Sequence, residues 1–161
     1  VSVEPPMFVD VVNVTSAADM AEVVKSKASE QDIIIMTAAV ADFCPAHPAD
    51  EKIKKKDSLD EPVIELERTE DILSYLGAHK AKGQLICGFS METQNMLENS
   101  KAKLAKKNAD MIVANNLKVA GAGFGTDTNV VTLITADECT ELEIMDKSCV
   151  AAKIMDRLLQ L

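Results

Sequence analysis

Apolar residues between positions 16 and 29 recur at the spacing of one helix face. They follow the i, i+3, i+4, i+7 pattern at Ala17, Met20, Ala21, Val24 and Ala28. Ser16 precedes this run and Asp19 follows three residues later, which resembles a capping box with Asp in place of Glu. The pattern predicts a helix over Ser16–Ser29 with one buried face.

The stretch Asp32–Thr37 carries a continuous apolar run, which is typical of a strand buried on both faces of a parallel sheet. Similar patterns predict further strands over Phe8–Val14, Val63–Leu66, Gln84–Phe89 and Asp110–Ala114. They predict further helices over Glu70–Lys80 (capped by Thr69), Asn95–Lys107 and Lys147–Leu159. Two late strands, Asn129–Thr135 and Glu141–Met145, are expected to form a β-hairpin around Ala136–Cys139.

This alternation of strands and helices predicts an α/β fold with three layers. The sheet is expected to be doubly wound, mostly parallel and Rossmann-like, with the late hairpin added. In such sheets ligands bind beyond the carboxyl ends of the strands. The loops expected at those ends are Ala38–Glu51, Ser90–Gln94 and Asn115–Asp127, and they hold most of the unusual residues.

The net charge of −9 and the isoelectric point near 4.7 argue against a general nucleic-acid or anionic-membrane binder, because no overall basic field exists. No apolar run approaches the roughly 20 residues that span a bilayer. The four cysteines form no CxxC pair and no zinc-type spacing, which favours a reduced, cytoplasmic protein. Cys87 lies in an apolar run and is expected to be a small core residue, and nothing supports a cysteine nucleophile.

The small-residue stretch Ala38–Asp42 follows the end of a predicted strand. Small side chains there let a flat ligand approach the backbone, and Asp42 could accept hydrogen bonds from a ligand or bind Mg²⁺ through water. A tight turn with Asp42 as a cap explains the same residues. The residues alone leave both interpretations open.

The run Lys52-Ile53-Lys54-Lys55-Lys56 is the densest basic segment of the acidic chain. In an extended conformation Lys52, Lys54 and Lys56 point to one side, which would suit a polyphosphate. A solvated charge run on a loop or a protected edge strand is the alternative.

Lys103 and Lys107 form an i, i+4 pair on a predicted helix. Like charges at this spacing cost a few tenths of a kcal/mol, roughly, and an anion between them would remove that cost. An ordinary solvent-facing side of the helix is the alternative. The glycine-rich Gly121–Asn129 is not a GxGxxG motif and precedes a strand, so a loop or lid is the better interpretation.

The ordered motifs AAVADF, EKIKK, TEDIL, GFSMET, AKLAKKNADMIVAN and GFGTDTN resemble those of phosphopantothenate–cysteine ligase. This family forms the ligase half of a bacterial bifunctional coenzyme A biosynthesis flavoprotein. The resemblance covers essentially the whole chain and implies one ligase domain over residues 1–161. It implies that phosphopantothenate, L-cysteine and CTP are substrates, that Mg²⁺ takes part, and that an acyl-cytidylate is the intermediate.

The resemblance also assigns roles to individual residues. Asp42 matches an Asp of the nucleotide site in the family. Asp42 and Lys52 are the two expected catalytic residues. The expected nucleotide-binding residues are Ala38, Ala39, Asp42, Lys52, Glu70, Asp71, Ile72, Leu73, Phe89, Lys103 and Lys107. Lys52, Lys54 and Lys55 match an extended flap that reaches across a homodimer interface in the family. The family often has Pro where Glu70 stands, and no metal-ligating side chain is assigned.

The family opens with a strand, a Gly/Ser-rich turn and a helix that carries an essential Asn, and this chain begins after them with VSVEPPMFVD. The resemblance therefore implies an N-terminally incomplete domain that lacks the flavin-dependent decarboxylase half. A non-catalytic nucleotide-binding or dimerisation fragment is the alternative to an active ligase. A nicotinamide-dependent reductase is disfavoured, because its glycine-rich turn is absent from the sequence.

Overall fold

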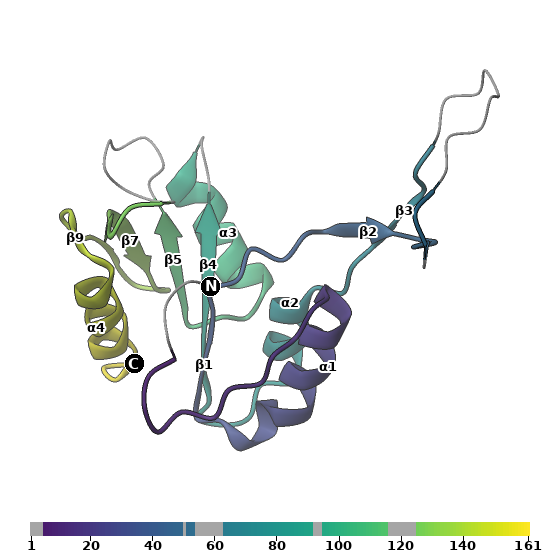
Figure 1. Cartoon of the computed structure of the whole chain (residues 1–161). Helices are drawn as coiled ribbons and strands as arrows, with labels where there is room; N and C mark the ends of the chain where they lie inside the picture. The colour runs from purple at the N-terminus through teal and green to yellow at the C-terminus, as the bar shows by residue number, and fades with distance from the viewer. Residues whose placement is uncertain (1–4, 50, 54–62, 92–94, 116–124) are drawn as a thin grey trace.

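A five-stranded sheet forms the centre of the computed structural model, which describes residues 5–49, 51–53, 63–91, 95–115 and 125–161. Its strands run in the order β1 (Ile33–Met36), β4 (Leu85–Met91), β5 (Met111–Asn115), β7 (Val131–Ile134) and β8 (Cys139–Glu141). The first three are parallel, and β7 and β8 are antiparallel to their neighbours. Figure 1 shows this sheet edge-on, with helices on both of its faces. The predicted mostly parallel α/β fold with a late hairpin is confirmed.

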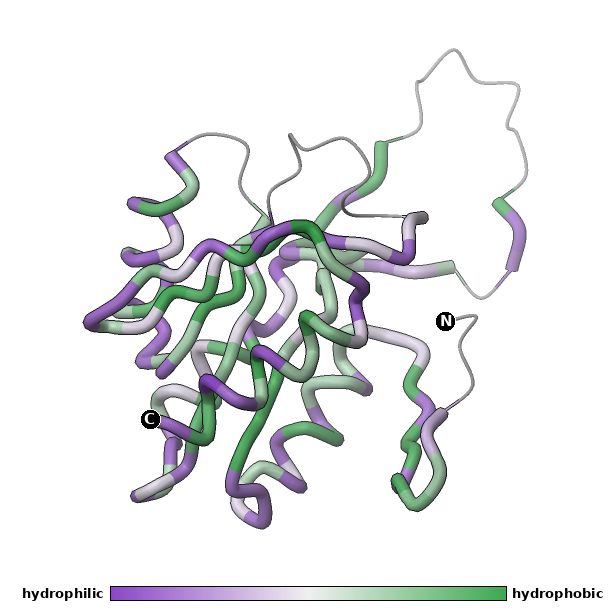
Figure 2. Tube along the Cα trace, turned by 90° about the vertical axis from the view of Figure 1, so that its left-hand side faces the viewer, coloured by the Kyte–Doolittle hydropathy of each residue, from purple (hydrophilic) through white to green (hydrophobic). Residues whose placement is uncertain are grey.

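Side-chain alternation along the central strands separates two apolar clusters, one on each face of the sheet. Helices α1 (Ala17–Lys27), α2 (Ile72–Ala78) and α3 (Met96–Lys106) cover the face that carries Ile86 and Ile112. Helix α4 (Lys147–Leu158) covers the opposite face, where Val150, Ile154 and Leu158 pack against Met111 and Val131. The hydropathy-coloured tube in Figure 2 shows apolar segments running through the central strands. The predicted three layers therefore form, with α1, α2 and α3 on one side of the sheet and α4 on the other.

The predictions for the two N-terminal apolar segments were partly wrong. Strand β1 exists, but all four of its residues are half-buried, because it lies at an edge of the sheet and pairs only with β4 among the described residues. Phe8–Val14 forms no strand, and Phe8 is fully exposed with a φ of 65°. A strand forms only where a neighbour pairs with its backbone groups, and no described segment does so here.

Helix boundaries depend on capping contacts that the sequence only partly reveals. The predicted capping box at Ser16 and Asp19 is confirmed, and α1 is followed by the short 3₁₀ helix η1 (Ala28–Glu30). Helix α2 begins two residues later than predicted. Its cap is Asp71 rather than Thr69, because the Asp71 carboxylate accepts the Ser74 N–H at 2.9 Å, while the Thr69 hydroxyl donates to the carbonyl of Ala41.

Replacing Asp19 by Ala is expected to lower the midpoint of thermal unfolding at neutral pH. Hydrogen bonds from Thr15 and Ser16 hold the pKa of Asp19 at about 2, below its usual 3.8. A carboxyl group whose pKa is lower in the folded state stabilises the fold above its unfolded-state pKa, and the effect is lost as the pH falls through the folded value. The difference between variant and wild type should therefore shrink as the pH approaches about 2. Glu22→Gln on the same helix is the control, and a pH-independent difference would contradict the prediction.

Two short strands form an arm that projects from the body of the protein (Figure 1). β2 (Phe43–Pro45) pairs antiparallel with β3 (Leu66–Arg68). The strand predicted over Val63–Leu66 was misplaced, because β3 begins only at Leu66. The sequence interpreted β2 as part of a loop, because its three residues include a proline.

The late hairpin is confirmed as β7 and β8, but its second strand was misplaced: β8 covers Cys139–Glu141 and shares only Glu141 with the predicted Glu141–Met145. The residues that follow instead form β9 (Met145–Asp146), which pairs with β6 (Thr128–Asn129). No helix in the described ranges is long and apolar enough to cross a membrane.

Candidate functional site

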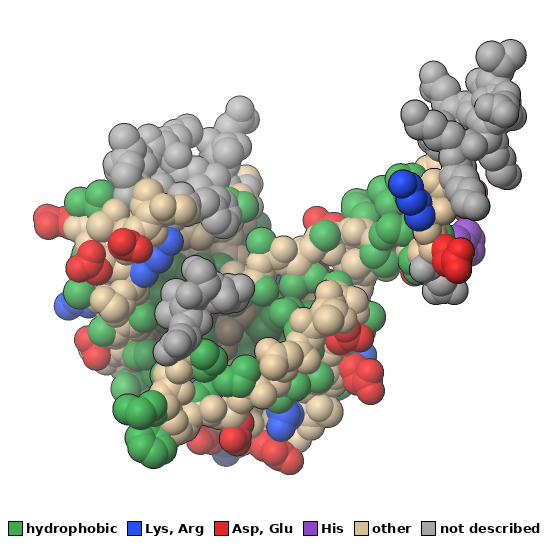
Figure 3. Space-filling view, in the orientation of Figure 1, with side chains coloured by type: hydrophobic (Ala, Val, Ile, Leu, Met, Phe, Trp, Pro, Cys, Tyr) green, Lys and Arg blue, Asp and Glu red, His purple; other side chains and the backbone are tan. Residues whose placement is uncertain are grey.

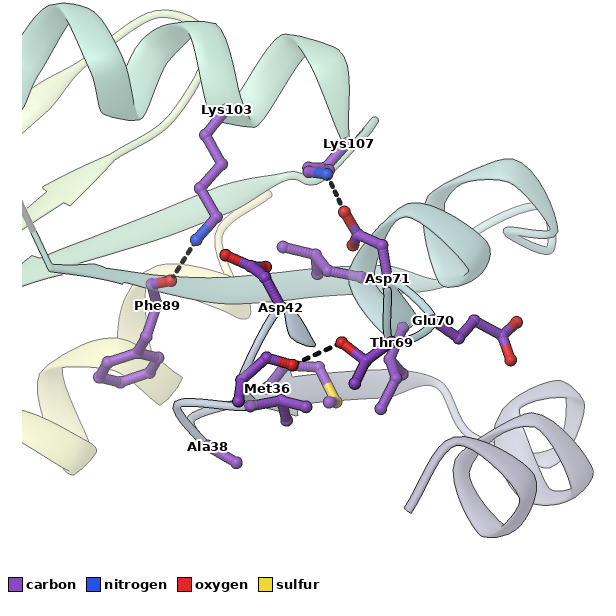
Figure 4. Close-up of a pocket in the computed structure, with 13 residues that line it drawn as sticks. Met36, Ala38, Asp42, Thr69, Glu70, Asp71, Phe89, Lys103 and Lys107 are labelled. Atoms are coloured by element: carbon purple, nitrogen blue, oxygen red, sulfur yellow. Dashed lines mark hydrogen bonds and ion pairs between the residues drawn. The ribbon is translucent and has the colours of Figure 1, made fainter. Parts of the chain in front are cut away.

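A cavity of about 220 Å³ lies beyond the carboxyl ends of β1 and β4 (Figure 4). Its walls come from the segment after β1, the residues that lead into α2, the end of β4 and one side of α3. Nine residues that the sequence predicted for one nucleotide site line it: Ala38, Asp42, Glu70, Asp71, Ile72, Leu73, Phe89, Lys103 and Lys107. This is the position at which α/β sheets bind ligands.

The remaining predicted residues do not line this cavity. Ala39 is exposed between the lining residues Ala38 and Val40, and Lys52 is exposed in the segment that follows β2 along the chain. Lys54 and Lys55 lie outside the described residues. Four lining residues were not predicted as site residues, namely Met36, Val40, Ala41 and Thr69. Val40 and Ala41 lie within the AAVADF motif, Thr69 opens the TEDIL motif, and Met36 stands two residues before AAVADF, so membership of these motifs was the signal that could have found three of them.

Two hydrogen bonds to backbone carbonyl oxygens join the two segments that form one wall of the cavity. The Thr69 hydroxyl donates to the carbonyl oxygen of Ala41 at 2.5 Å, and the Thr69 N–H donates to the carbonyl oxygen of Asp42 at 3.0 Å. The β2–β3 pairing brings these distant segments together immediately before the cavity. In Figure 4 the Asp42 carboxylate points into the cavity from this wall.

The two lysines on α3 point into the cavity but have different partners. The Lys103 ammonium donates to the carbonyl oxygen of Phe89 at 2.8 Å. The Lys107 ammonium pairs with the Asp71 carboxylate and donates to the Ser74 hydroxyl oxygen at 2.8 Å. Separate partners weaken the mutual repulsion expected for an i, i+4 lysine pair. Ser74 was not predicted as a site residue, because only the fold brings α2 next to the end of α3.

A buried hydroxyl pair holds α3 against the end of β4. Ser90 and Ser100 share a hydrogen bond of 2.8 Å, and both are buried. Ser90 follows Phe89 on the strand, and Ser100 lies one turn before Lys103 on the helix. The pair therefore fixes the distance between the Phe89 carbonyl and the helix that carries both lysines.

The charges that line the cavity are three carboxylates, Asp42, Glu70 and Asp71, and two ammonium groups, Lys103 and Lys107. Glu70 pairs with Lys25 at 2.9 Å, and its hydrogen bond raises the pKa of Lys25. Asp71 pairs with Lys107, so the lining charges without an ion-pair partner among the described residues are Lys103 and Asp42. An ammonium group and a carboxylate facing one cavity suit a polar, phosphate-bearing ligand that also carries hydrogen-bond donors.

The described residues provide neither a preformed metal centre nor an activated thiol near this cavity. They contain no group of three or more His, Cys, Asp or Glu side chains that could hold a metal ion. Cys87 is buried, and burial together with the charge of Asp110 raises its pKa to about 12. Its thiol is therefore protonated at neutral pH, as expected for a small core residue.

The fold and the cavity define an α/β domain with a candidate ligand site at the carboxyl ends of its parallel strands. The chain belongs to the family of the DNA/pantothenate metabolism flavoprotein C-terminal domain, whose family model matches residues 1–161. This agrees with the family that the sequence motifs indicated.

Relatives with known names are considerably longer than this chain. The coenzyme A biosynthesis bifunctional protein CoaBC of Bacillus subtilis (strain 168) is 46% identical over 156 residues, which are 96% of this chain and 38% of that protein. CoaBC of Escherichia coli (strain K12) is 34% identical over 159 residues, which are 98% of this chain and 39% of that protein. The chain thus spans less than half the length of these relatives.

Solved structures share the fold. The crystal structure of a C-terminal domain of CoaBC superposes with a TM-score of 0.78 at 42% identity, over 99% of this chain and 71% of that one. A mutant of Cab2 in complex with phosphopantothenate-cysteine superposes with a TM-score of 0.64 at 17% identity, over 91% of this chain and 52% of that one. At this lower identity the likeness establishes a common fold alone.

Proposed function

We propose that this chain is the nucleotide-binding part of a phosphopantothenate–cysteine ligase that uses CTP and Mg²⁺ in coenzyme A biosynthesis. The observation that carries the proposal is the convergence of Asp42, Lys103 and Lys107 on one cavity at the carboxyl ends of β1 and β4. The names of the CoaBC relatives support the pathway. In a bifunctional protein, a flavin-dependent decarboxylase half would be the covalent partner.

In the proposed reaction, a carboxylate oxygen of phosphopantothenate attacks the α-phosphorus of CTP. Pyrophosphate leaves with the electron pair of the broken P–O bond, and an acyl-cytidylate forms. The amine nitrogen of cysteine then attacks the acyl carbon, CMP leaves, and the amine loses a proton. Lys103 and Lys107 stabilise the negative charge on the phosphates, and the exposed backbone at Ala38 and Ala39 lies against the acyl-nucleotide.

Asp42 fits the part that the proposal gives it. Glu70 and Asp71 are ion-paired, whereas no hydrogen bond or ion pair within the described segments engages the Asp42 carboxylate. Mg²⁺ in nucleotide sites is held by substrate phosphates and one or two carboxylates, often through water. Asp42 would hold such an ion, which would supply positive charge next to the phosphates.

The arm suggests how Lys52 reaches a site. The cavity of about 220 Å³ is smaller than the roughly 300–1,000 Å³ of most ligand pockets, so a further segment is needed to enclose a nucleotide. The arm and the residues beside it expose the large apolar side chains Phe43, Ile53, Val63, Ile64 and Leu66, and Figure 3 shows apolar side chains gathered on the projecting arm. Exposed apolar side chains gathered in one place favour contact with a partner. In the proposed homodimer, the arm of one subunit brings Lys52, with Lys54 and Lys55, to the cavity of the other.

Calorimetric titration of the chain with CTP and Mg²⁺, followed by a pyrophosphate-release assay with phosphopantothenate, tests this proposal. We expect binding of CTP, weaker binding of ATP, and pyrophosphate release that depends on phosphopantothenate. Light scattering on the same sample is expected to give the mass of a dimer.

The possible outcomes separate the two candidate functions. Binding without pyrophosphate release would favour the non-catalytic nucleotide-binding fragment over the ligase. Absence of CTP binding would overturn both, and a monomeric mass would overturn the delivery of Lys52 by a partner subunit.

A further inference from the structure

Lys107 is held by two side chains of different character. Its ammonium group pairs with the Asp71 carboxylate and donates to the Ser74 hydroxyl oxygen at 2.8 Å. The Lys107 side chain is only 13% exposed, whereas that of Asp71 is 51% exposed. A charged partner therefore lies on the solvent side of Lys107, and a neutral partner lies on the more buried side.

The two carboxylate oxygens of Asp71 have separate partners. Oδ1 accepts the backbone N–H of Ser74 at 2.9 Å and so caps α2, while Oδ2 faces Lys107. Partial burial alone would raise the pKa of Asp71, but the hydrogen bonds from Lys107 and Ser74 outweigh it and lower the pKa. Asp71 is therefore ionised at neutral pH. Its cap on α2 persists whether or not Lys107 remains beside it.

Lys103 differs from Lys107 in its partner. The ammonium of Lys103 donates to a neutral carbonyl oxygen, that of Phe89, so no carboxylate of the described residues compensates its positive charge. The positive charge of Lys107 is cancelled by Asp71. In the free protein, the two lysines therefore offer an incoming phosphate about one positive charge in place of two. Figure 4 shows the two pairs, Lys103 with Phe89 and Lys107 with Asp71, among the residues that line the cavity.

We infer that the Asp71 carboxylate occupies the position on Lys107 that a ligand phosphate takes, so that binding exchanges one anion for the other. Ser74 keeps its hydrogen bond to Lys107 and holds the ammonium group in place during the exchange. Asp71 is then an internal competitor that lowers the affinity of the site for phosphates, and Ser74 is a positioning residue. This inference rests on the proposed function, because it requires a phosphate-bearing ligand in this cavity.

Asp71→Asn tests the exchange by titration with CTP and Mg²⁺. Asn caps helices as well as Asp does, so α2 and the fold are retained while the competing charge is removed. We expect CTP to bind about fivefold more tightly to Asp71→Asn than to the wild type, which corresponds to the loss of one partly exposed ion pair. In a Lys107→Met background, the same substitution is expected to leave CTP affinity unchanged, because the competition requires Lys107.

Substitutions at two further positions, Glu70 and Ser74, separate the exchange from general charge and packing effects. Glu70→Gln removes one negative charge from the adjacent lining residue, but that residue pairs with Lys25 rather than Lys107, so a smaller gain in affinity is expected. Ser74→Ala is expected to weaken CTP binding, and Ser74→Thr, which keeps the hydroxyl, is expected to restore it. A purely structural role for Ser74 would change the midpoint of unfolding without this rescue of affinity.

The outcomes distinguish the inference from the function on which it rests. If the wild type binds CTP and Asp71→Asn binds it no more tightly, the exchange is overturned and the proposed function stands. The exchange is also overturned if Asp71→Asn tightens binding equally in the Lys107→Met background. If neither the wild type nor Asp71→Asn binds CTP, the proposed function fails and the exchange fails with it.

Discussion

Replacing Lys103 by Met is expected to weaken CTP binding about 100-fold, because a hydrogen bond between a charged donor and a phosphate contributes about 1.5–3 kcal/mol. Lys103 lines the cavity, and its only partner among the described side chains and backbone groups is the neutral carbonyl of Phe89. Its full charge is therefore available to a phosphate. Met retains the length and apolar stem of the side chain, so the fold should be retained, and calorimetric titration measures the change.

Lys106→Met provides the matched control. Lys106 lies on the same helix but is exposed and does not line the cavity. Its replacement by Met makes the same change in net charge as Lys103→Met. CTP affinity should change by less than about twofold, because interactions between exposed charges are weak and screened by salt. Equal losses in the two variants would mean that CTP senses only the overall charge of α3 and not a defined contact.

Replacing Gly77 by Ala is expected to destabilise the fold by about 3 kcal/mol or more. Gly77 is buried at the end of α2, where α2 approaches the end of α3. A Cβ added there would lie 1.8 Å from the carbonyl oxygen of Lys107, a backbone atom that cannot move without displacing the helix. The gain of about 1 kcal/mol that Ala normally brings inside a helix is too small to offset this clash. Because Lys107 is the residue displaced, CTP affinity should fall as well.

Gly83→Ala separates this clash from a general effect of replacing glycine. Gly83 has a φ of +85° and nothing within 4 Å of an added Cβ, so only backbone strain is introduced. A loss of roughly 1–2 kcal/mol in unfolding free energy, without a change in CTP affinity, is expected. Denaturant unfolding of both variants measures the difference. A loss for Gly77→Ala no larger than that for Gly83→Ala would show that α2 and α3 can separate at little cost.

Much of the candidate site could be anticipated from the sequence because its residues follow strand ends. Asp42 and Phe89 lie at or near the carboxyl ends of strands, and ligands bind there in α/β sheets. The i, i+4 spacing of Lys103 and Lys107 placed both on one side of α3. The roles of these residues in binding CTP remain predictions. What the spacing could not provide was the partner of each lysine, since Asp71 and Ser74 reach Lys107 only through packing of α2 against α3.

The sequence by itself determined the alternation of the central parallel strands with helices, the one-sided helix α1 with its capping box, and the family. These features depend on local periodicity, on contacts a few residues apart and on motifs that are contiguous along the chain. Only the tertiary structure decided that β1 is an edge strand, that Phe8–Val14 forms no strand, and that Asp71 caps α2 and pairs with Lys107. The physical reason is that strand pairing, burial and ion pairing each require two segments to meet. Residues far apart in the chain meet only after the sheet and its helices have packed.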